Sequence, residues 1–279
     1  MMKISSMLKL SIITTLLSTS LYADFDKKIL SYEKHRVAQN PAVKVKDVKL
    51  SFKKDLGDGW NGYVFAIELN YNGKDIKTND TLFSNGQFVT SELKKPTGLD
   101  LKRLLHPKLD AKYYDKKLLI AGNSDAKHKL VVFSDPLCPN CTGLMPELIK
   151  DAQDNPTKLG LYYVVMPLDR LHPTARTLAK ASKIAKEQGV KNVDYKVYTA
   201  DFHKYFDPYQ EKDDKKALES FNKVLKTNIT MAQVNNKSIE EELKHHMDLA
   251  DEAMIQGTPT MFFDGEVDLM RNKHKEIIK

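Results

Sequence analysis

The sequence predicts an α/β fold for the C-terminal part of the chain, preceded by a small α+β domain. Between Val43 and Val89, strand-type residues alternate in polarity and are separated by turn signals. From Lys117 onwards, short apolar strand patterns alternate with helical ones, which predicts a parallel pair of strands joined by a helical crossover. Pro96-Thr97-Gly98 interrupts both patterns, so we expect the boundary between the two domains there.

Residues 1–23 are predicted to be a secretory signal peptide. A basic start precedes the uncharged, apolar run Leu10–Ala23, which is shorter than the roughly 20 residues that a transmembrane helix needs. A buried N-terminal helix is the alternative, but charges should interrupt the solvent face of such a helix. We therefore expect an exported protein whose mature chain begins at Asp24.

Residues 24–95 are predicted to form the small N-terminal domain. Apolar residues at helical spacing predict a helix over Phe25–Arg36, which Pro41 separates from the first strand. Strands are predicted at Val43–Phe52 and Tyr63–Tyr71, with hairpin turns at Gly57-Asp58-Gly59 and Asn72-Gly73. One helix and a few strands make a domain with little core, a size that often needs a partner chain.

Residues 96–115 are predicted to form a linker helix. Four leucines at helical spacing indicate this helix, namely Leu101, Leu104, Leu105 and Leu109. Pro107 is expected to interrupt or kink it.

Residues 116–279 are predicted to form the α/β domain, with a helical insertion at about 170–250. Its strands are expected at Leu118–Ala121, Leu130–Phe133, Leu159–Met166 and Met261–Phe263. A helix should follow the second strand through Leu144 and Leu148, and the insertion should hold helices at Thr174–Gln188, Ala217–Leu225 and Ile239–Ile255.

The charge distribution argues against a nucleic-acid partner. The formal net charge is +7, and Lys3 and Lys9 would leave with the signal peptide. Lysines and acidic residues are interspersed through most of the chain, whereas a nucleic-acid binder more often carries a concentrated basic patch with aromatic residues in it. We therefore expect an ordinary solvated surface and no nucleic-acid partner.

The two cysteines, Cys138 and Cys141, are the strongest indication of chemistry. An exported protein that depended on disulfides for stability would carry several spaced pairs, and a bridge across two residues removes little entropy from the unfolded chain. Disulfide exchange needs one accessible thiolate and a second thiol close behind it. Cys138 would lie at a helix N-terminus, where the free N–H groups favour the anion, and Cys141 one turn further in.

Other roles for the cysteine pair are less well matched. A zinc site would need two further ligands, and the histidines offer no second paired motif. Haem attachment needs a histidine directly after the second cysteine, and position 142 is threonine. An inert structural bridge remains an alternative. We expect no metal and no cofactor.

Thr258-Pro259 is the second candidate site element. Taken alone, a proline before an apolar strand is most simply a turn residue. Together with the cysteine pair, a cis peptide at Pro259 would bring the backbone of Thr258 alongside the sulfurs, ready to pair with an extended substrate.

These motifs resemble the bacterial periplasmic Dsb proteins, and most closely the DsbC and DsbG disulfide isomerases. The resemblance depends on Phe133-Ser134-Asp135, Cys138-Pro139-Asn140-Cys141, a long helical insertion and Gly257-Thr258-Pro259. It implies a thioredoxin-like catalytic domain, a cystatin-like dimerisation domain and a linker helix. It also implies that Cys138 attacks, that Cys141 resolves, and that the Thr258-Pro259 loop faces both.

Details around the cysteines leave the redox poise open. Thioredoxin and the oxidase DsbA resemble each other in having a buried acid six residues before the first cysteine, where this chain has Val132. Asp135, three residues before it, resembles DsbC, whereas the Pro-Asn dipeptide is nearer to DsbA. Asp135 would either relay protons to Cys141 or cap the following turn. Solvent-facing or capping roles are expected for the histidines at 172, 245 and 246.

The sequence therefore predicts a homodimeric periplasmic protein that isomerises disulfides in unfolded or misoxidised exported proteins. Such an isomerase needs a DsbD-like membrane reductant. The first alternative is a DsbA-like oxidase, which a DsbB-like membrane oxidant would recharge. The second is a dimeric chaperone, whose activity would survive replacement of both cysteines.

Overall fold

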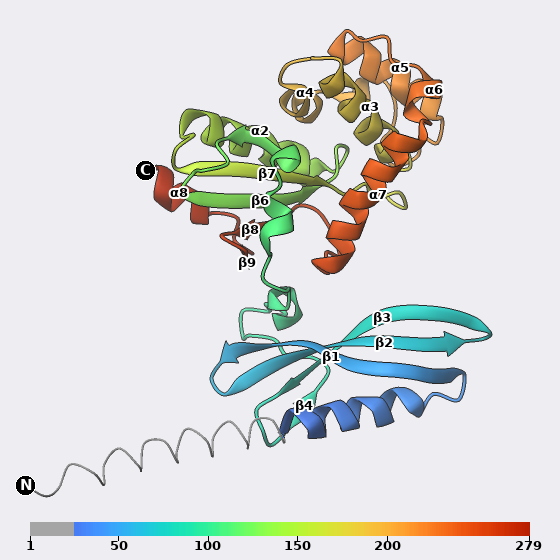
Figure 1. Ribbon diagram of the computed structural model, residues 1–279, viewed down its shortest axis with the longest axis vertical. Coiled ribbons are helices and arrows are strands. Elements are labelled where there is room, and N and C mark those ends of the chain that lie inside the picture. Colours follow the sequence, from blue (N-terminus) through green and yellow to red (C-terminus); the bar gives the residue numbers. More distant parts are fainter. Residues whose placement is uncertain (1–24) are drawn as a thin grey trace, which may run out of the picture. The chain divides into compact units, whose positions relative to one another are not determined.

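The computed structural model describes residues 25–279 (Figure 1). The chain divides into two compact units, residues 1–105 and residues 106–279. The predicted signal peptide, residues 1–23, lies outside the described residues. Within the described part, no helix is both long enough and apolar enough to cross a membrane.

The N-terminal unit consists of a helix through residues 25–38 and a four-stranded antiparallel sheet. Its strands, in the spatial order β1-β2-β3-β4, are Val43–Gly57, Trp60–Tyr71, Lys74–Ser84 and Val89–Thr90. The two predicted hairpin turns are confirmed, because Asp58-Gly59 and Asn72-Gly73 connect the strands with positive φ angles at all four residues. The alternating apolar residues of β2 and β3 form a core with Ile29 of the helix, so this unit has the α+β composition that the sequence predicts.

The linker helix predicted over residues 96–115 is not formed. The segment instead contains two short 3-10 helices, η1 (Leu101–Leu104) and η2 (Ala111–Tyr114). The side chains of Asp100 and Asp110 cap them. Pro107 has no N–H for a helical hydrogen bond and disfavours helical backbone at the residue before it, which explains why the leucine spacing does not produce a continuous helix.

The C-terminal unit is built on a five-stranded mixed sheet, as predicted for an α/β fold. In the spatial order β5-β7-β6-β8-β9, its strands are Leu119–Gly122, Leu159–Val165, His128–Ser134, Thr260–Phe263 and Glu266–Val267. The predicted parallel pair is confirmed, because β6 runs parallel to β7 and helix α2 (Pro139–Asp154) connects them. The other pairs are antiparallel.

The centre of this sheet is fully enclosed, which accounts for the continuous apolar sequence of β6. Leu130, Val131, Val132 and Phe133 are all buried, as expected for a strand covered on both faces. On one face, Met145 and Leu148 of α2 pack in a cluster that also contains Val132 and both cysteines. The rigid junction between β6 and α2 is the part of the fold that positions the cysteine pair.

Five α-helices and one short 3-10 helix, η4 (Phe202–Lys204), occupy the segment between β7 and β8 where the sequence predicts a helical insertion (Figure 1). The α-helices are α3 (Ala175–Glu187), α4 (Val193–Thr199), α5 (Asp214–Leu225), α6 (Met231–Val234) and α7 (Lys237–Glu252). A core of its own, which includes Leu178, Val197 and Phe221, holds these helices together. The sequence predicts α3, α5 and α7 but not the short helices α4 and α6, and α8 (Lys273–Ile278) ends the chain.

Candidate active site

The cysteine pair lies where β6 gives way to α2. Cys138 is the N-cap residue of α2 in extended conformation, and Pro139 is the first helical residue. Proline suits this position, because the N–H that it lacks would have no partner inside the helix. The Cys138 carbonyl accepts from the N–H groups of Cys141 and Thr142, both at 2.9 Å. The local sequence therefore places the first sulfur at the helix N-terminus and the second one turn further along.

The Cys138 thiol is much more acidic than an ordinary cysteine. A hydrogen bond from the Cys141 thiol is the largest cause, and contacts from Thr258 and from the backbone N–H groups of Asn140 and Cys141 add to it. Together they outweigh the effect of burial and lower the pKa of Cys138 to about 5. At neutral pH this sulfur is therefore a thiolate, the form that attacks disulfides.

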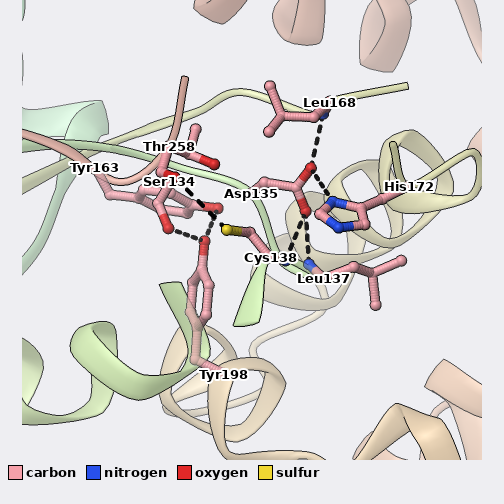
Figure 2. A network of polar contacts seen from close by, with 9 residues as sticks. All are labelled: Ser134, Asp135, Leu137, Cys138, Tyr163, Leu168, His172, Tyr198 and Thr258. Atoms are coloured by element: carbon pink, nitrogen blue, oxygen red, sulfur yellow. Dashed lines mark hydrogen bonds and ion pairs between the residues drawn. The ribbon is translucent and has the colours of Figure 1, made fainter. Parts of the chain in front are cut away.

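Cys138 is more enclosed than the exposed thiolate that the sequence predicts, with only 6% of the residue accessible. In the thiol form its sulfur donates to the Thr258 carbonyl at 3.6 Å. Figure 2 shows the sulfur pointing toward Thr258. The Thr258 hydroxyl is buried as well, and it lies beside the sulfurs of Cys138 and Cys141, whose pKa values it lowers. The sulfur is therefore largely enclosed, with the Thr258 loop directly beside it.

Cys141 has the opposite chemistry. Its side chain is completely buried, and burial, followed by its hydrogen bond to Cys138, raises its pKa far above the ordinary value. Both cysteines are present as free thiols. The pair thus consists of an acidic thiol at the helix N-terminus and a protonated thiol one turn behind it.

Asp135 organises the turn between β6 and α2. Its Oδ1 accepts from the N–H groups of Leu137 at 2.7 Å and Cys138 at 3.1 Å. Its Oδ2 accepts from the Leu168 N–H at 2.7 Å and lies 3.0 Å from His172 Nδ1 (Figure 2). A carboxylate has about four acceptor positions, and all of them are occupied here. Of the two roles left open by the sequence, the geometry supports the cap and leaves no position for a relay to Cys141.

His172 is buried, and the expectation of a solvent-facing or simple capping role for it is wrong. Only 2% of the residue is exposed, and its ring packs against Tyr209 with 5.2 Å between the ring centroids. Burial alone would lower the pKa of His172, but the hydrogen bond and charge of Asp135, together with the charge of Cys138, outweigh it and raise the pKa. His172 is therefore a buried partner of Asp135.

The Thr258-Pro259 loop reaches the cysteines because β8 pairs with β6. The register aligns Val132 with Met261 and Phe133 with Thr260, so the residues just before β8 lie beside the residues just after β6. The Thr258-Pro259 peptide bond is cis. The structure thus brings Cys138, Cys141, Thr258 and Pro259 to one end of the sheet, although 120 residues separate Cys138 from Thr258.

A family model described as thioredoxin matches residues 115–277, which contain this whole arrangement. The chain belongs to the thioredoxin family. The match covers the C-terminal unit and not the N-terminal one, so it establishes a thioredoxin-like α/β fold for the part of the chain that carries the cysteines.

Solved structures with similarity to the thioredoxin-like unit are distant relatives. DsbA2 of Pseudomonas aeruginosa is 21% identical, with 54% of this chain and 83% of that chain covered and a TM-score of 0.40. The catalytic domain of Proteus mirabilis ScsC is 20% identical, with 60% and 92% covered and a TM-score of 0.43. A periplasmic thioredoxin-like protein from Salmonella enterica serovar Typhimurium is 17% identical, with 60% and 94% covered and a TM-score of 0.44. No curated protein sequence matches the chain.

Three residues that lie in the site were not among the site residues predicted from the sequence. The hydroxyls of Ser134, Tyr163 and Tyr198 are buried and hydrogen-bonded to one another beside the cysteines (Figure 2). Ser134 directly precedes Asp135, so its position could have been inferred from the strand. Tyr163 and Tyr198 carry no local signal, because a buried tyrosine is usual in a protein core.

The other two histidines differ from each other. His245 is exposed, as expected. His246 Nδ1 accepts from the Val165 N–H at 3.2 Å, and burial lowers the pKa of His246 to about 4. His246 is therefore a neutral acceptor for the end of β7. Among residues 25–279, no group of three or more histidine, cysteine or acidic side chains is placed to hold a metal ion.

Proposed function

We propose that the protein is a thiol-disulfide oxidoreductase that isomerises disulfides in exported proteins through Cys138 and Cys141. The opposite acidity of the two thiols is the observation that carries the proposal. Cys138 ionises with a pKa of about 5, and burial keeps Cys141 protonated behind it. A structural pair would need no such difference, whereas exchange needs one thiolate to attack and one thiol held in reserve.

In the proposed reaction, the Cys138 thiolate attacks one sulfur of a misformed substrate disulfide. A bond forms between Cys138 and that sulfur, and the other substrate sulfur leaves as a thiolate. A different substrate thiolate can then displace Cys138, which completes an isomerisation with no net change of oxidation state. Alternatively, Cys141 loses its proton and displaces the substrate, which leaves the substrate reduced and the protein with a Cys138–Cys141 disulfide.

The Thr258 loop is proposed to hold the substrate during the attack. The Thr258 carbonyl lies 3.6 Å from the Cys138 sulfur, so this backbone runs directly beside the atom that attacks. An extended substrate segment could hydrogen-bond to this backbone as an added strand. Such pairing recognises the main chain rather than particular side chains, which suits a protein that must accept many substrates.

Alkylation of the reduced protein as a function of pH tests the nucleophile assignment. Cys138 should react with iodoacetamide with a midpoint near pH 5, because that is where its thiol ionises. Cys141 should remain unmodified through neutral pH, because burial raises its pKa. Mass mapping of the alkylated peptide separates the two residues. A midpoint near the ordinary cysteine value of about 8.5, or earlier labelling of Cys141, would contradict the proposal.

The low pKa of Cys138 also favours a second candidate, a dithiol oxidase. Stabilising the reduced thiolate makes the corresponding disulfide more oxidising. Refolding of scrambled and of reduced ribonuclease distinguishes the two activities. The isomerase should rescue scrambled ribonuclease when it is supplied as the dithiol. Rescue of only the reduced substrate, by the disulfide form, would show that the oxidase is the correct assignment.

The proposal includes the periplasm as the place of action and a homodimer as the working form. The apolar N-terminal segment supports export, and a membrane protein would then set the redox state: a DsbD-like reductant for an isomerase or a DsbB-like oxidant for an oxidase. In the described chain, β1 pairs only with β2 and forms one edge of its sheet, and such edges are used for pairing between chains. Light scattering should give twice the mass of the mature chain, and a monomeric mass would contradict the dimer.

A further inference from the structure

A chain of buried hydroxyl groups starts beside the cysteines. The Tyr198 hydroxyl donates to Ser134 Oγ at 2.8 Å, and the hydroxyls of Tyr198 and Tyr163 are 2.8 Å apart (Figure 2). The three residues come from different elements, β6, α4 and β7, and all three are buried. Three elements thus meet to align three buried hydroxyls in one hydrogen-bonded row.

The inner end of this hydroxyl chain is Cys141, which belongs to the same buried cluster as Tyr163 and Tyr198 and whose pKa the neighbouring Ser134 hydroxyl helps to set. Cys141 is completely buried, so its thiol has no direct route for a proton to solvent. The nearby carboxylate of Asp135 has its four acceptor positions filled by Leu137, Cys138, Leu168 and His172. The proton of Cys141 therefore needs another path.

The outer end of the hydroxyl chain is Tyr163, which lines a cavity of about 300 Å³. Lys186 and Asp194 also line this cavity, and they form an ion pair at 2.7 Å. Further charged side chains line this cavity, among them Lys183 and Glu242, and a cavity of this size with polar partners can hold several water molecules. Tyr163 therefore lies between the buried hydroxyls and a place where protons can exchange with water.

We propose that Ser134, Tyr198 and Tyr163 form a proton relay between Cys141 and the water of this cavity. The inference rests on the proposed function, because it concerns the thiol that resolves the mixed disulfide. In the observed arrangement Tyr198 donates inward to Ser134. When Cys141 is released as a thiolate, Ser134 passes it a proton, Tyr198 replaces the proton of Ser134, Tyr163 replaces that of Tyr198, and cavity water supplies Tyr163.

Resolution of a mixed disulfide uses the same relay in the opposite direction, after the hydroxyls have rotated. The Cys141 proton passes to Ser134, each hydroxyl passes its own proton outward, and one proton enters the cavity. The Cys141 sulfur then bonds to Cys138, and the substrate sulfur leaves with the electron pair of the broken bond. No oxidant other than the substrate disulfide is needed.

The surroundings of the relay keep its tyrosine hydroxyls protonated between turnovers. Burial raises the pKa values of Tyr163 and Tyr198 well above those of ordinary tyrosines. Cys141 and Asp135 lie on the inner side, and Asp194, paired with Lys186, lies at the outer end. The relay thus moves protons through neutral hydroxyls.

Glutathione release measures the relay in the full-length reduced protein. Attack of Cys138 on oxidised glutathione releases one glutathione, and resolution by Cys141 releases a second. Tyr198→Phe should leave the first release unchanged and slow the second by about 100-fold, a typical contribution of assisted proton transfer. The rate of the second release in this variant should rise about tenfold per pH unit, since hydroxide must replace the relay. The wild-type rate should depend less on pH.

Tyr162→Phe is the matched control, because Tyr162 is a buried tyrosine of β7, next to Tyr163, whose hydroxyl donates to the Ser124 carbonyl at 3.5 Å and not to the relay. It should leave both releases unchanged. An unchanged first release also shows that each variant is folded. If Tyr198→Phe and Tyr162→Phe resolve at the same rate, the relay is wrong while the proposed function stands. If the wild type releases no second glutathione, the proposed function itself fails.

Discussion

Replacing Cys138 by serine is expected to reduce disulfide exchange to the rate observed without the protein. Cys138 supplies the thiolate that is already ionised at neutral pH, and a serine hydroxyl does not ionise in this range. The other cysteine cannot substitute for it, because burial raises its pKa. Refolding of scrambled ribonuclease by wild type and variant measures the loss. Exchange above background in Cys138→Ser would contradict the assignment of the nucleophile.

Cys141→Ser is the matched variant for this experiment. Cys138 can still attack in this variant, but no second thiol releases the substrate, so mixed disulfides should accumulate and appear on a non-reducing gel. The two substitutions change the same side-chain atom three residues apart and should give opposite results. If both variants lost exchange activity equally and neither formed mixed disulfides, the proposed assignment of attack to Cys138 and of resolution to Cys141 would be wrong.

Asp135→Ala is expected to destabilise the thioredoxin-like unit by about 3–5 kcal/mol, the usual cost of removing one partner of a buried charged pair. The substitution would leave the N–H groups of Leu137 and Leu168 and the ring of His172 without their acceptor. The Cys138 N–H would keep its second acceptor, the Asp135 carbonyl. Denaturant unfolding measures the change. Asp169→Ala is a suitable control, because Asp169 makes a partly exposed ion pair with Arg176 and its loss should cost less than about 1 kcal/mol.

The same substitution should remove a pH dependence of stability. The pKa of His172 is raised in the folded protein, since Asp135 and the Cys138 charge together outweigh burial. A raised pKa contributes stability that is complete below the unfolded histidine value of about 6.5 and is lost as the pH rises through the folded value. Wild-type stability should therefore fall as the pH rises above about 6.5. A loss of stability below 1 kcal/mol in Asp135→Ala would contradict the organising role of this carboxylate.

The sequence predicts those parts of the site whose position depends on neighbouring residues in the chain. Cys138 lies at a helix N-terminus because an apolar strand, a turn and Pro139 follow one another directly, and these signals are readable within a few residues. The position of Thr258 is not local, and it was expected from the combination of the cysteine pair with Thr258-Pro259 and from the resemblance to the Dsb proteins. The predicted strand that follows Thr258 is confirmed: it is β8, and its pairing with β6 places Thr258 beside Cys138.

The partners of Asp135 could not be predicted, because they depend on tertiary packing. His172 is 37 residues away, and the proline after it suggests a surface turn rather than burial. Tyr198 is 64 residues from Ser134 and belongs to α4, a two-turn helix that the apolar pattern does not reveal. The prediction of a linker helix around Pro107 was wrong for a different reason. The leucines there have helical spacing, but the proline prevents the backbone from forming a continuous helix.

The order of the strands also has a consequence for biosynthesis. The sulfur of Cys138 receives part of its acidity from Thr258, which the ribosome adds 120 residues later and which reaches the thiol only when β8 joins β6. A partly translated chain contains both cysteines but lacks the loop that faces them. The full acidity of Cys138 is therefore a property of the finished polypeptide.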